Sequence, residues 1–113
     1  VNVAQIRRND RVLVLGQGIV GQLAARLARL QGAAHVAVAD RVGVRLGVSQ
    51  ADQVIDITRE SLDEAVGEAN INVLIEATGS MTALAGALPL LANHGRVLLL
   101  GDYDHINIPY APV

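Results

Sequence analysis

Two kinds of hydrophobic pattern alternate along this chain. Short, almost wholly apolar runs are typical of strands covered on both faces, and they occur at residues 11–15, 35–39, 53–57, 73–75 and 96–101. Segments with helical spacing lie between them, at residues 19–30, 61–69 and about 81–91. Residues 41–52 have weak periodicity and contain two glycines, so we expect one short helix there at most. The alternation predicts an α/β fold with a parallel sheet, whose sites lie beyond the carboxyl ends of the strands.

The first predicted helix, residues 19–30, is amphipathic. Its large apolar residues recur at helical intervals, namely Ile19, Leu23, Leu27 and Leu30. Its polar side chains fall on the other side, namely Gln22, Arg26 and Arg29. This pattern predicts that the leucine side packs on the sheet.

Composition excludes several classes of protein. The 113 residues are 51% hydrophobic and 18% charged, which excludes disorder and predicts one domain. The chain has no cysteine, so disulfides, thiolate nucleophiles and cysteine-ligated metals are excluded. The net charge is −2, and no apolar run is long enough to span a bilayer. We therefore expect a cytoplasmic protein that binds neither nucleic acid nor membrane.

A glycine-rich motif joins the first strand to the first helix. Gly16, Gly18 and Gly21 form G-x-G-x-x-G, in which the first glycine allows a tight turn, the second admits a pyrophosphate and the third lets the helix approach the strand. The amides of Ile19 and Val20, at the start of the helix, would bind the phosphates. The motif predicts a dinucleotide site.

An acidic residue supports this interpretation. Asp40 ends the next strand, 19 residues after Gly21, close to the expected separation of about 20. A carboxylate there would accept hydrogen bonds from the adenosine ribose and repel a 2′-phosphate, so NAD is preferred over NADP. Arg41 would flank the adenine, although its guanidinium could also pair with a 2′-phosphate.

Longer stretches of sequence resemble one family. Residues 11–21, 72–80 and 87–101, with the strand that ends at Asp40, are similar to the cofactor domain of the medium-chain dehydrogenase/reductases, the zinc-type alcohol, sorbitol and threonine dehydrogenase-like group. The resemblance implies a Rossmann sheet in the order 3-2-1-4-5 and hydride transfer between NAD and an alcohol or ketone. It also implies further cofactor-binding residues: Arg45 at the adenosine ribose, Thr78 and Gly79 beside the nicotinamide ribose, and Gly101 and Asp102 facing the nicotinamide. We leave out Glu76, since an acid at a strand end often only caps the next element.

Two departures from the family pattern limit what the chain can do. The segment after Arg45 is about three residues shorter than the family pattern, which predicts a short or irregular second helix. The family's catalytic domain, with its zinc ligands and proton relay, would precede Val1, and a sixth strand would follow Val113. The three histidines have no metal-ligand spacing. Residues 1–113 are therefore expected to form a dinucleotide-binding domain that is inactive alone, with no catalytic or metal residue, from an enzyme that is a homo-oligomer.

Two other classes of protein also bind nucleotides through a glycine-rich first loop. A regulatory nucleotide-sensing Rossmann module needs no catalytic domain, but acidic contacts would be expected in place of residues 78–80. A methyltransferase would bind S-adenosylmethionine, and the third glycine, Gly21, argues against it.

Overall fold

The computed structural model describes residues 6–47, 49–67 and 70–100. Its strands are β1 (Arg11–Leu15), β2 (His35–Asp40), β3 (Gln53–Asp56), β4 (Ile71–Glu76) and β5 (Leu91–Leu99). Its helices are α1 (Ile19–Leu30), α2 (Gly43–Gly47), α3 (Leu62–Val66), α4 (Met81–Ala87) and the 3₁₀ turn η2 (Leu88–Leu90). All paired strands are parallel, in the order β3-β2-β1-β4-β5, which confirms the predicted fold. No helix in these ranges has the length and apolar character that a membrane span requires.

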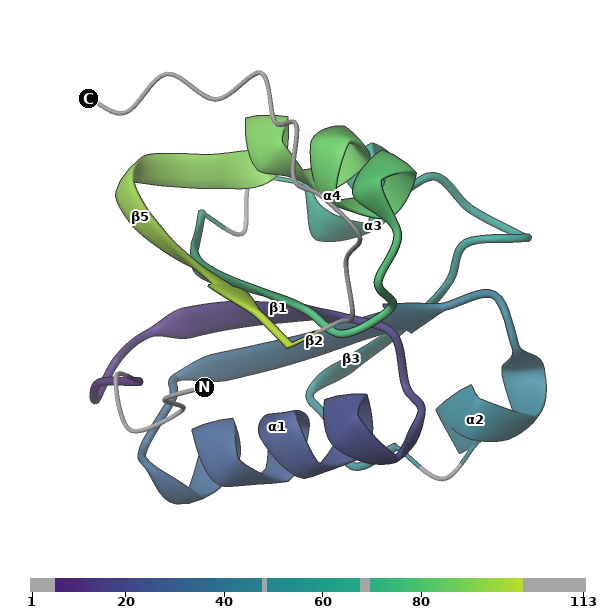
Figure 1. Ribbon diagram of the computed structural model, residues 1–113. Helices are drawn as coiled ribbons and strands as arrows, with labels where there is room; N and C mark the ends of the chain where they lie inside the picture. The colour runs from purple at the N-terminus through teal and green to yellow at the C-terminus, as the bar shows by residue number, and fades with distance from the viewer. Residues whose placement is uncertain (1–5, 48, 68–69, 101–113) are drawn as a thin grey trace.

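The sheet is covered on both faces. Helix α1 lies on one face and helices α3 and α4 lie on the other (Figure 1). A hydrophobic core lies on each face of the sheet, and successive strand residues alternate between the two. Val12 and Val14 pack on the α1 side, whereas Leu13 and Leu15 pack on the side of α3 and α4. Because the strands are parallel, their carboxyl ends and the loops that follow β1, β2 and β4 meet at one edge of the sheet.

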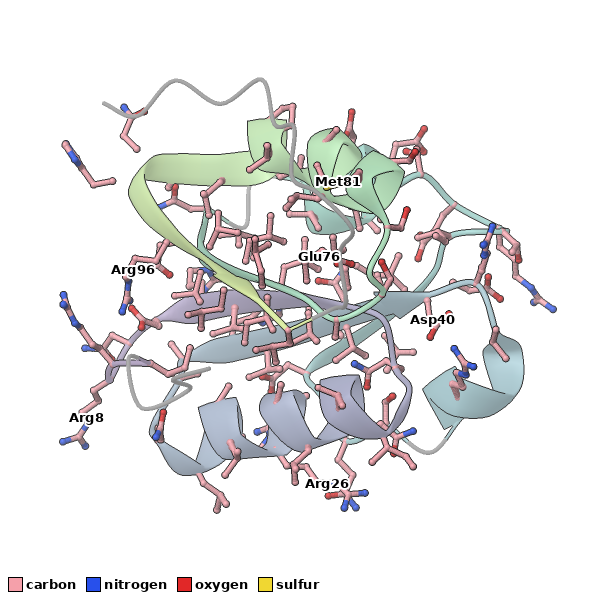
Figure 2. The ribbon with its side chains drawn as sticks, in the orientation of Figure 1. Arg8, Arg26, Asp40, Glu76, Met81 and Arg96 are labelled. Atoms are coloured by element: carbon pink, nitrogen blue, oxygen red, sulfur yellow. The ribbon has the colours of Figure 1, made fainter. Side chains whose placement is uncertain are left out.

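Helix α1 contacts the sheet through its small residues, so the predicted packing side was wrong. Its buried residues are Gly21, Ala24, Ala25 and Ala28. Its large apolar residues are exposed, with Ile19 at 87% and Leu30 at 80%. Arg26 points away from the sheet, as predicted (Figure 2). Small side chains let the helix axis approach the strands closely, and that approach leaves the leucines outside.

Strand β5 starts earlier than the apolar run that predicts it. Leu91 already pairs with Ile71, five residues before the expected start, and pairing resumes at Arg96 opposite Val73 after an irregular stretch. Within this stretch His94 has a φ of 64°. The exposed polar residues of the irregular stretch hide the first part of the strand from a hydrophobic pattern. The predicted helix at 81–91 accordingly ends at Ala87, followed by η2.

A buried polar cluster ties the amino ends of three strands together, at the edge opposite the glycine-rich loop. Asp10 is 4% exposed and accepts hydrogen bonds from the Arg7 amide (2.6 Å) and the Asn72 side chain (2.9 Å), and it forms an ion pair with Arg96 (2.5 Å). Burial alone would raise the pKa of Asp10, but these hydrogen bonds and the Arg96 charge outweigh it, so the pKa is lowered. The cluster stabilises the fold and lies away from the predicted site.

Candidate dinucleotide-binding site

The glycine-rich loop makes a tight turn over the end of β1. Gly16 has a φ of +96°, in the left-handed region that favours glycine. A Cβ on Gly21 would lie 1.9 Å from the Gly16 carbonyl oxygen, so only glycine lets α1 start this close to the strand. The backbone fold therefore requires glycine at positions 16 and 21, whether or not a ligand binds.

Gly18 differs from the other two glycines because the fold does not require it. Its φ is −70°, which any residue adopts, and a Cβ built there meets no atom within 4 Å. The first helical hydrogen bond runs from the Gln22 amide to the Gly18 carbonyl, so the amides of Ile19, Val20 and Gly21 have no acceptor within the helix. The loop thus leaves open space in front of backbone donors at a positive helix end, which suits a phosphate group.

Asp40 lies at the end of β2, beside this loop, with its side chain 7% exposed. Its Oδ2 accepts the Gln17 amide at 2.7 Å. Its Oδ1 accepts the amides of Arg41 (2.7 Å) and Val42 (3.1 Å). A carboxylate offers about four acceptor positions, so these three amides leave one for a ligand. Asp40 therefore caps its own turn and can still accept a hydrogen bond from a ribose hydroxyl.

The two arginines that follow Asp40 occupy different positions. Arg41 lines the cavity at the sheet edge. Arg45, on α2, places its guanidinium 3.7 Å from Asp40 Oδ2, and its side chain is about half exposed. Arg45 is absent from the cavity wall and contacts Asp40 from α2.

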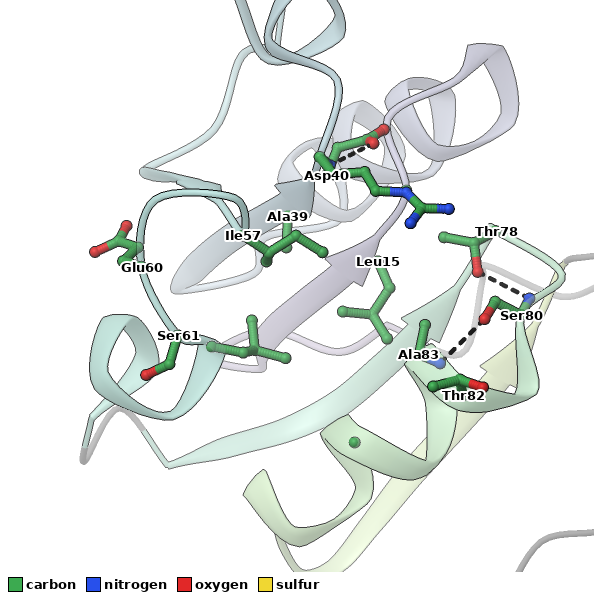
Figure 3. Close-up of a pocket in the computed structure, with 14 residues that line it drawn as sticks. Leu15, Ala39, Asp40, Ile57, Glu60, Ser61, Thr78, Ser80, Thr82 and Ala83 are labelled. Carbon is green, nitrogen blue, oxygen red and sulfur yellow. Dashed lines mark hydrogen bonds between the residues drawn. The ribbon is translucent and has the colours of Figure 1, made fainter.

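A cavity of about 590 Å³ runs between the ends of β1, β2 and β4 (Figure 3). Of the predicted site residues, it brings together Gly16, Asp40, Arg41 and Thr78. Its wall is completed by residues 15, 39, 57, 60–62, 80, 82, 83 and 86. Five further predicted residues do not line it: Gly18 and Gly79 lie in loops, and Ile19, Val20 and Gly21 form the start of α1. Gly101 and Asp102 lie outside the described residues.

Gln17 supports the glycine-rich loop, although sequence reasoning gave it no role. It is fully buried, and its side chain donates to the Gly16 carbonyl (2.8 Å) and accepts from the Ser49 hydroxyl (2.7 Å). A glutamine in the second position of an otherwise apolar loop was the available signal. Its partner Ser49 lies 32 positions away and becomes visible only in three dimensions.

Glu76 caps the turn after β4, which agrees with the interpretation made from its position in the sequence. It is fully buried at the centre of the molecule (Figure 2). Its Oε1 accepts the Thr78 amide at 2.8 Å and also bonds the Thr78 hydroxyl, and its Oε2 accepts the Gly79 amide at 3.0 Å. The carboxylate thus fixes the loop that lies opposite Asp40 across the sheet edge.

The part of the chain that the structure describes provides a binding site without a metal centre. In these residues no group of three or more His, Cys, Asp or Glu side chains could hold a metal ion. The ionisable side chains on the cavity wall are Asp40, Arg41 and Glu60. The arrangement can bind a polyanionic nucleotide and orient it.

Comparison with known families identifies the family of this chain. The sequence model of the family described as zinc-binding dehydrogenase matches residues 20–113. The chain belongs to this family. The matched stretch contains residues 72–80 and 87–101, so the family assignment agrees with the resemblance that these residues carry.

Curated relatives and solved structures agree with the family assignment. The chain is 35% identical over 100 residues to L-threonine 3-dehydrogenase of Ruegeria pomeroyi, covering 81% of this chain and 29% of the relative. It is 33% identical over 113 residues to sorbitol dehydrogenase of Bombyx mori, covering 91% and 32%. A zinc-binding dehydrogenase from Sinorhizobium meliloti bound to NADP superposes with a TM-score of 0.85 at 25% identity, covering 96% and 34%. The chain therefore spans about a third of the length of these relatives.

Proposed function

We propose that this chain is the dinucleotide-binding part of an oxidoreductase that transfers hydride between a nicotinamide cofactor and an alcohol or ketone. The observation that carries the proposal is the common cavity of Gly16, Asp40 and Thr78, with the open space at Gly18 beside it. The named relatives act on threonine and sorbitol, which carry hydroxyl groups, and one solved relative is bound to NADP. When bound, the cofactor supplies the carbon that accepts or donates hydride.

Different residues of this chain would bind different parts of the cofactor. The diphosphate would lie against the amides of Ile19 and Val20, where the helix end is positive. The adenosine ribose would bind Asp40 at its remaining acceptor position. The second nucleoside would lie across the switch point between β1 and β4, over Thr78 and Gly79. The chain therefore binds and orients, and we expect cofactor binding without turnover from residues 1–113.

We propose NAD as the preferred form. Asp40 is buried, and in a dinucleotide bound as proposed its charge would face the position of a 2′-phosphate. Like charges at this distance oppose binding, whereas a free 2′-hydroxyl donates to the carboxylate. Arg41 and Arg45 act in the other direction, since guanidinium groups attract a phosphate. The Arg45 guanidinium lies 3.7 Å from Asp40 Oδ2, so part of its charge is balanced by the carboxylate.

Among the described residues no group of three or more His, Cys, Asp or Glu side chains could hold a metal ion, and the proposed role of these residues is to bind the cofactor. Homo-oligomer formation and a cytoplasmic location stay predictions from the sequence.

A differential thermal shift experiment tests the proposal. NAD, NADP and S-adenosylmethionine are titrated separately against the chain, and a ligand that binds the folded state raises its melting temperature. We expect the largest rise with NAD, a smaller one with NADP and none with S-adenosylmethionine. A rise with S-adenosylmethionine alone would instead indicate a methyltransferase. Assembly triggered by a nucleotide, measured by light scattering, would indicate a regulatory module.

A further inference from the structure

We propose that Glu76 is a positioning residue for the nicotinamide half of the dinucleotide, acting through the turn that it holds at residues 77–80. The proposal rests on the proposed function and extends it to a residue that does not line the cavity. Glu76 is fully buried at the end of β4, and its carboxylate accepts hydrogen bonds from the turn that follows it.

The hydrogen bonds of Glu76 continue along the turn to the next helix. The Thr78 hydroxyl, which bonds Glu76, accepts the Ser80 amide at 2.9 Å. The Ser80 hydroxyl in turn accepts the Ala83 amide at 3.1 Å and caps α4 (Figure 3). The buried carboxylate is therefore the fixed end of a chain of bonds that sets the position of the whole loop.

This loop also contacts the glycine-rich loop. A Cβ on Gly16 would lie 2.8 Å from the Thr78 methyl group, so the two loops touch where the cavity begins. Thr78 and Ser80 line the cavity, while Asp40 lines its other end. With the adenosine ribose at Asp40, the second nucleoside must extend toward the loop after β4. A loop fixed before binding loses less conformational entropy when the ligand arrives.

The consequence of losing Glu76 is specific to one half of the ligand. If the turn is released, a ligand that contacts it must order it again, whereas a ligand confined to Asp40 and the glycine-rich loop does not. AMP contains only the adenosine half, and NAD contains both halves. The ratio of their affinities therefore separates the positioning role from a general loss of structure.

The test compares Glu76→Gln with Ile75→Val by isothermal titration calorimetry with NAD and AMP. The first variant keeps the side-chain size but replaces one accepting oxygen by an NH₂ group. Ile75 is the adjacent, fully buried residue, it packs against α1, and its variant loses one methyl group. We expect Glu76→Gln to weaken the binding of NAD about tenfold, the size of one lost charge-assisted hydrogen bond. The binding of AMP should weaken by less than about twofold. We expect Ile75→Val to leave the ratio of NAD affinity to AMP affinity unchanged.

A second measurement works without any ligand. Hydrogen exchange followed by NMR reports on the amides of Thr78 and Gly79, which donate hydrogen bonds to the Glu76 carboxylate. Their exchange should accelerate in Glu76→Gln relative to the amides of β1, and not in Ile75→Val. Equal weakening of NAD and AMP, or unchanged NAD affinity with faster exchange, would overturn the positioning role. Failure of the unmodified chain to bind NAD would contradict the proposed function itself, and the Glu76 proposal with it.

Discussion

The backbone amide of Gln17 donates a hydrogen bond to Asp40 Oδ2 at 2.7 Å. This bond joins the glycine-rich loop to the acid at the end of the neighbouring strand, so the two parts of the candidate site hold each other in place. The Gln17 side chain adds bonds to the Gly16 carbonyl and to Ser49. The loop proposed to bind the diphosphate and the carboxylate proposed to bind the ribose are therefore joined by hydrogen bonds within the chain.

Substitutions at the second and third glycines of the motif should have different effects. Gly18→Ala should leave the free energy of unfolding within about 0.5 kcal/mol of that of the unmodified chain, because its Cβ meets no other atom. The same variant should weaken the binding of NAD, because the Cβ would fill the proposed phosphate position. Gly21→Ala should unfold the chain more easily, since its Cβ would overlap the Gly16 carbonyl. Urea denaturation and calorimetry with NAD distinguish the two. Normal NAD binding by a well-folded Gly18→Ala variant would place the diphosphate elsewhere.

Asp40 should control the choice between NAD and NADP. Asp40→Asn removes the charge and keeps the size of the side chain, so the ratio of NAD to NADP affinity should fall by about tenfold, the effect of one charge-assisted hydrogen bond. Measuring both cofactors on the same variant cancels any loss of folded protein. Asp40→Ser should shift the ratio in the same direction. Equal affinities in the unmodified chain would disprove the assignment of NAD.

The exposed leucines of α1 should contribute little to folding. Leu30→Gln, at a position 80% exposed, should change the free energy of unfolding by less than about 0.5 kcal/mol. Ala28→Leu, at a position that is fully buried against the sheet, should cost about 1–3 kcal/mol by overpacking. Chemical denaturation of the two variants is the measurement. The reverse ranking would mean that the leucine side faces the sheet after all.

Stability should fall in acid through Asp10. Its pKa is lower in the folded chain than the ordinary value of 3.8, so the unfolded state binds a proton at a higher pH. The stabilisation is complete above the unfolded pKa and is lost as the pH falls through the folded one. Asp10→Asn should therefore be less stable by about 1–3 kcal/mol at pH 7, with a difference that shrinks in acid.

The control for this pH dependence is Glu64→Gln, at an exposed position on α3. It should follow the unmodified chain at every pH, because it removes a carboxylate without a buried partner. The pKa of Asp52 is also lowered, chiefly by the hydrogen bond from the Val36 amide, so part of the acid dependence should survive in Asp10→Asn. Urea titrations between pH 2.5 and 7, a range of about one unit or more on each side of the ordinary carboxyl pKa, provide the data. An undiminished difference in acid would contradict the account.

The sequence predicts the parallel sheet because buried parallel strands carry continuous apolar runs, and the strand order follows from the family resemblance. It predicts the wrong side of α1 because a hydrophobic pattern gives leucine more weight than alanine, whereas close helix packing selects Ala24, Ala25 and Ala28. It misses the first part of β5 because Asn93 and His94 interrupt the apolar pattern.

Part of the candidate site could be predicted and part could not. The glycines and Asp40 have fixed spacing with a known physical purpose, so they could be found from one sequence. Gln17 and Glu76 act from buried positions through other residues, and neither has a motif of its own. Their importance depends on contacts with Ser49 and with the Thr78 turn, which only the fold defines.

The most direct test of the central claim is an NMR titration of the ¹⁵N-labelled chain with NAD, recording the shift of each backbone amide. We expect the largest changes at the amides of Ile19 and Val20, where the diphosphate would bind, with further changes at Asp40, Arg41, Thr78 and Gly79. Saturable changes confined to other parts of the chain, with the amides of Ile19 and Val20 unmoved, would contradict this claim.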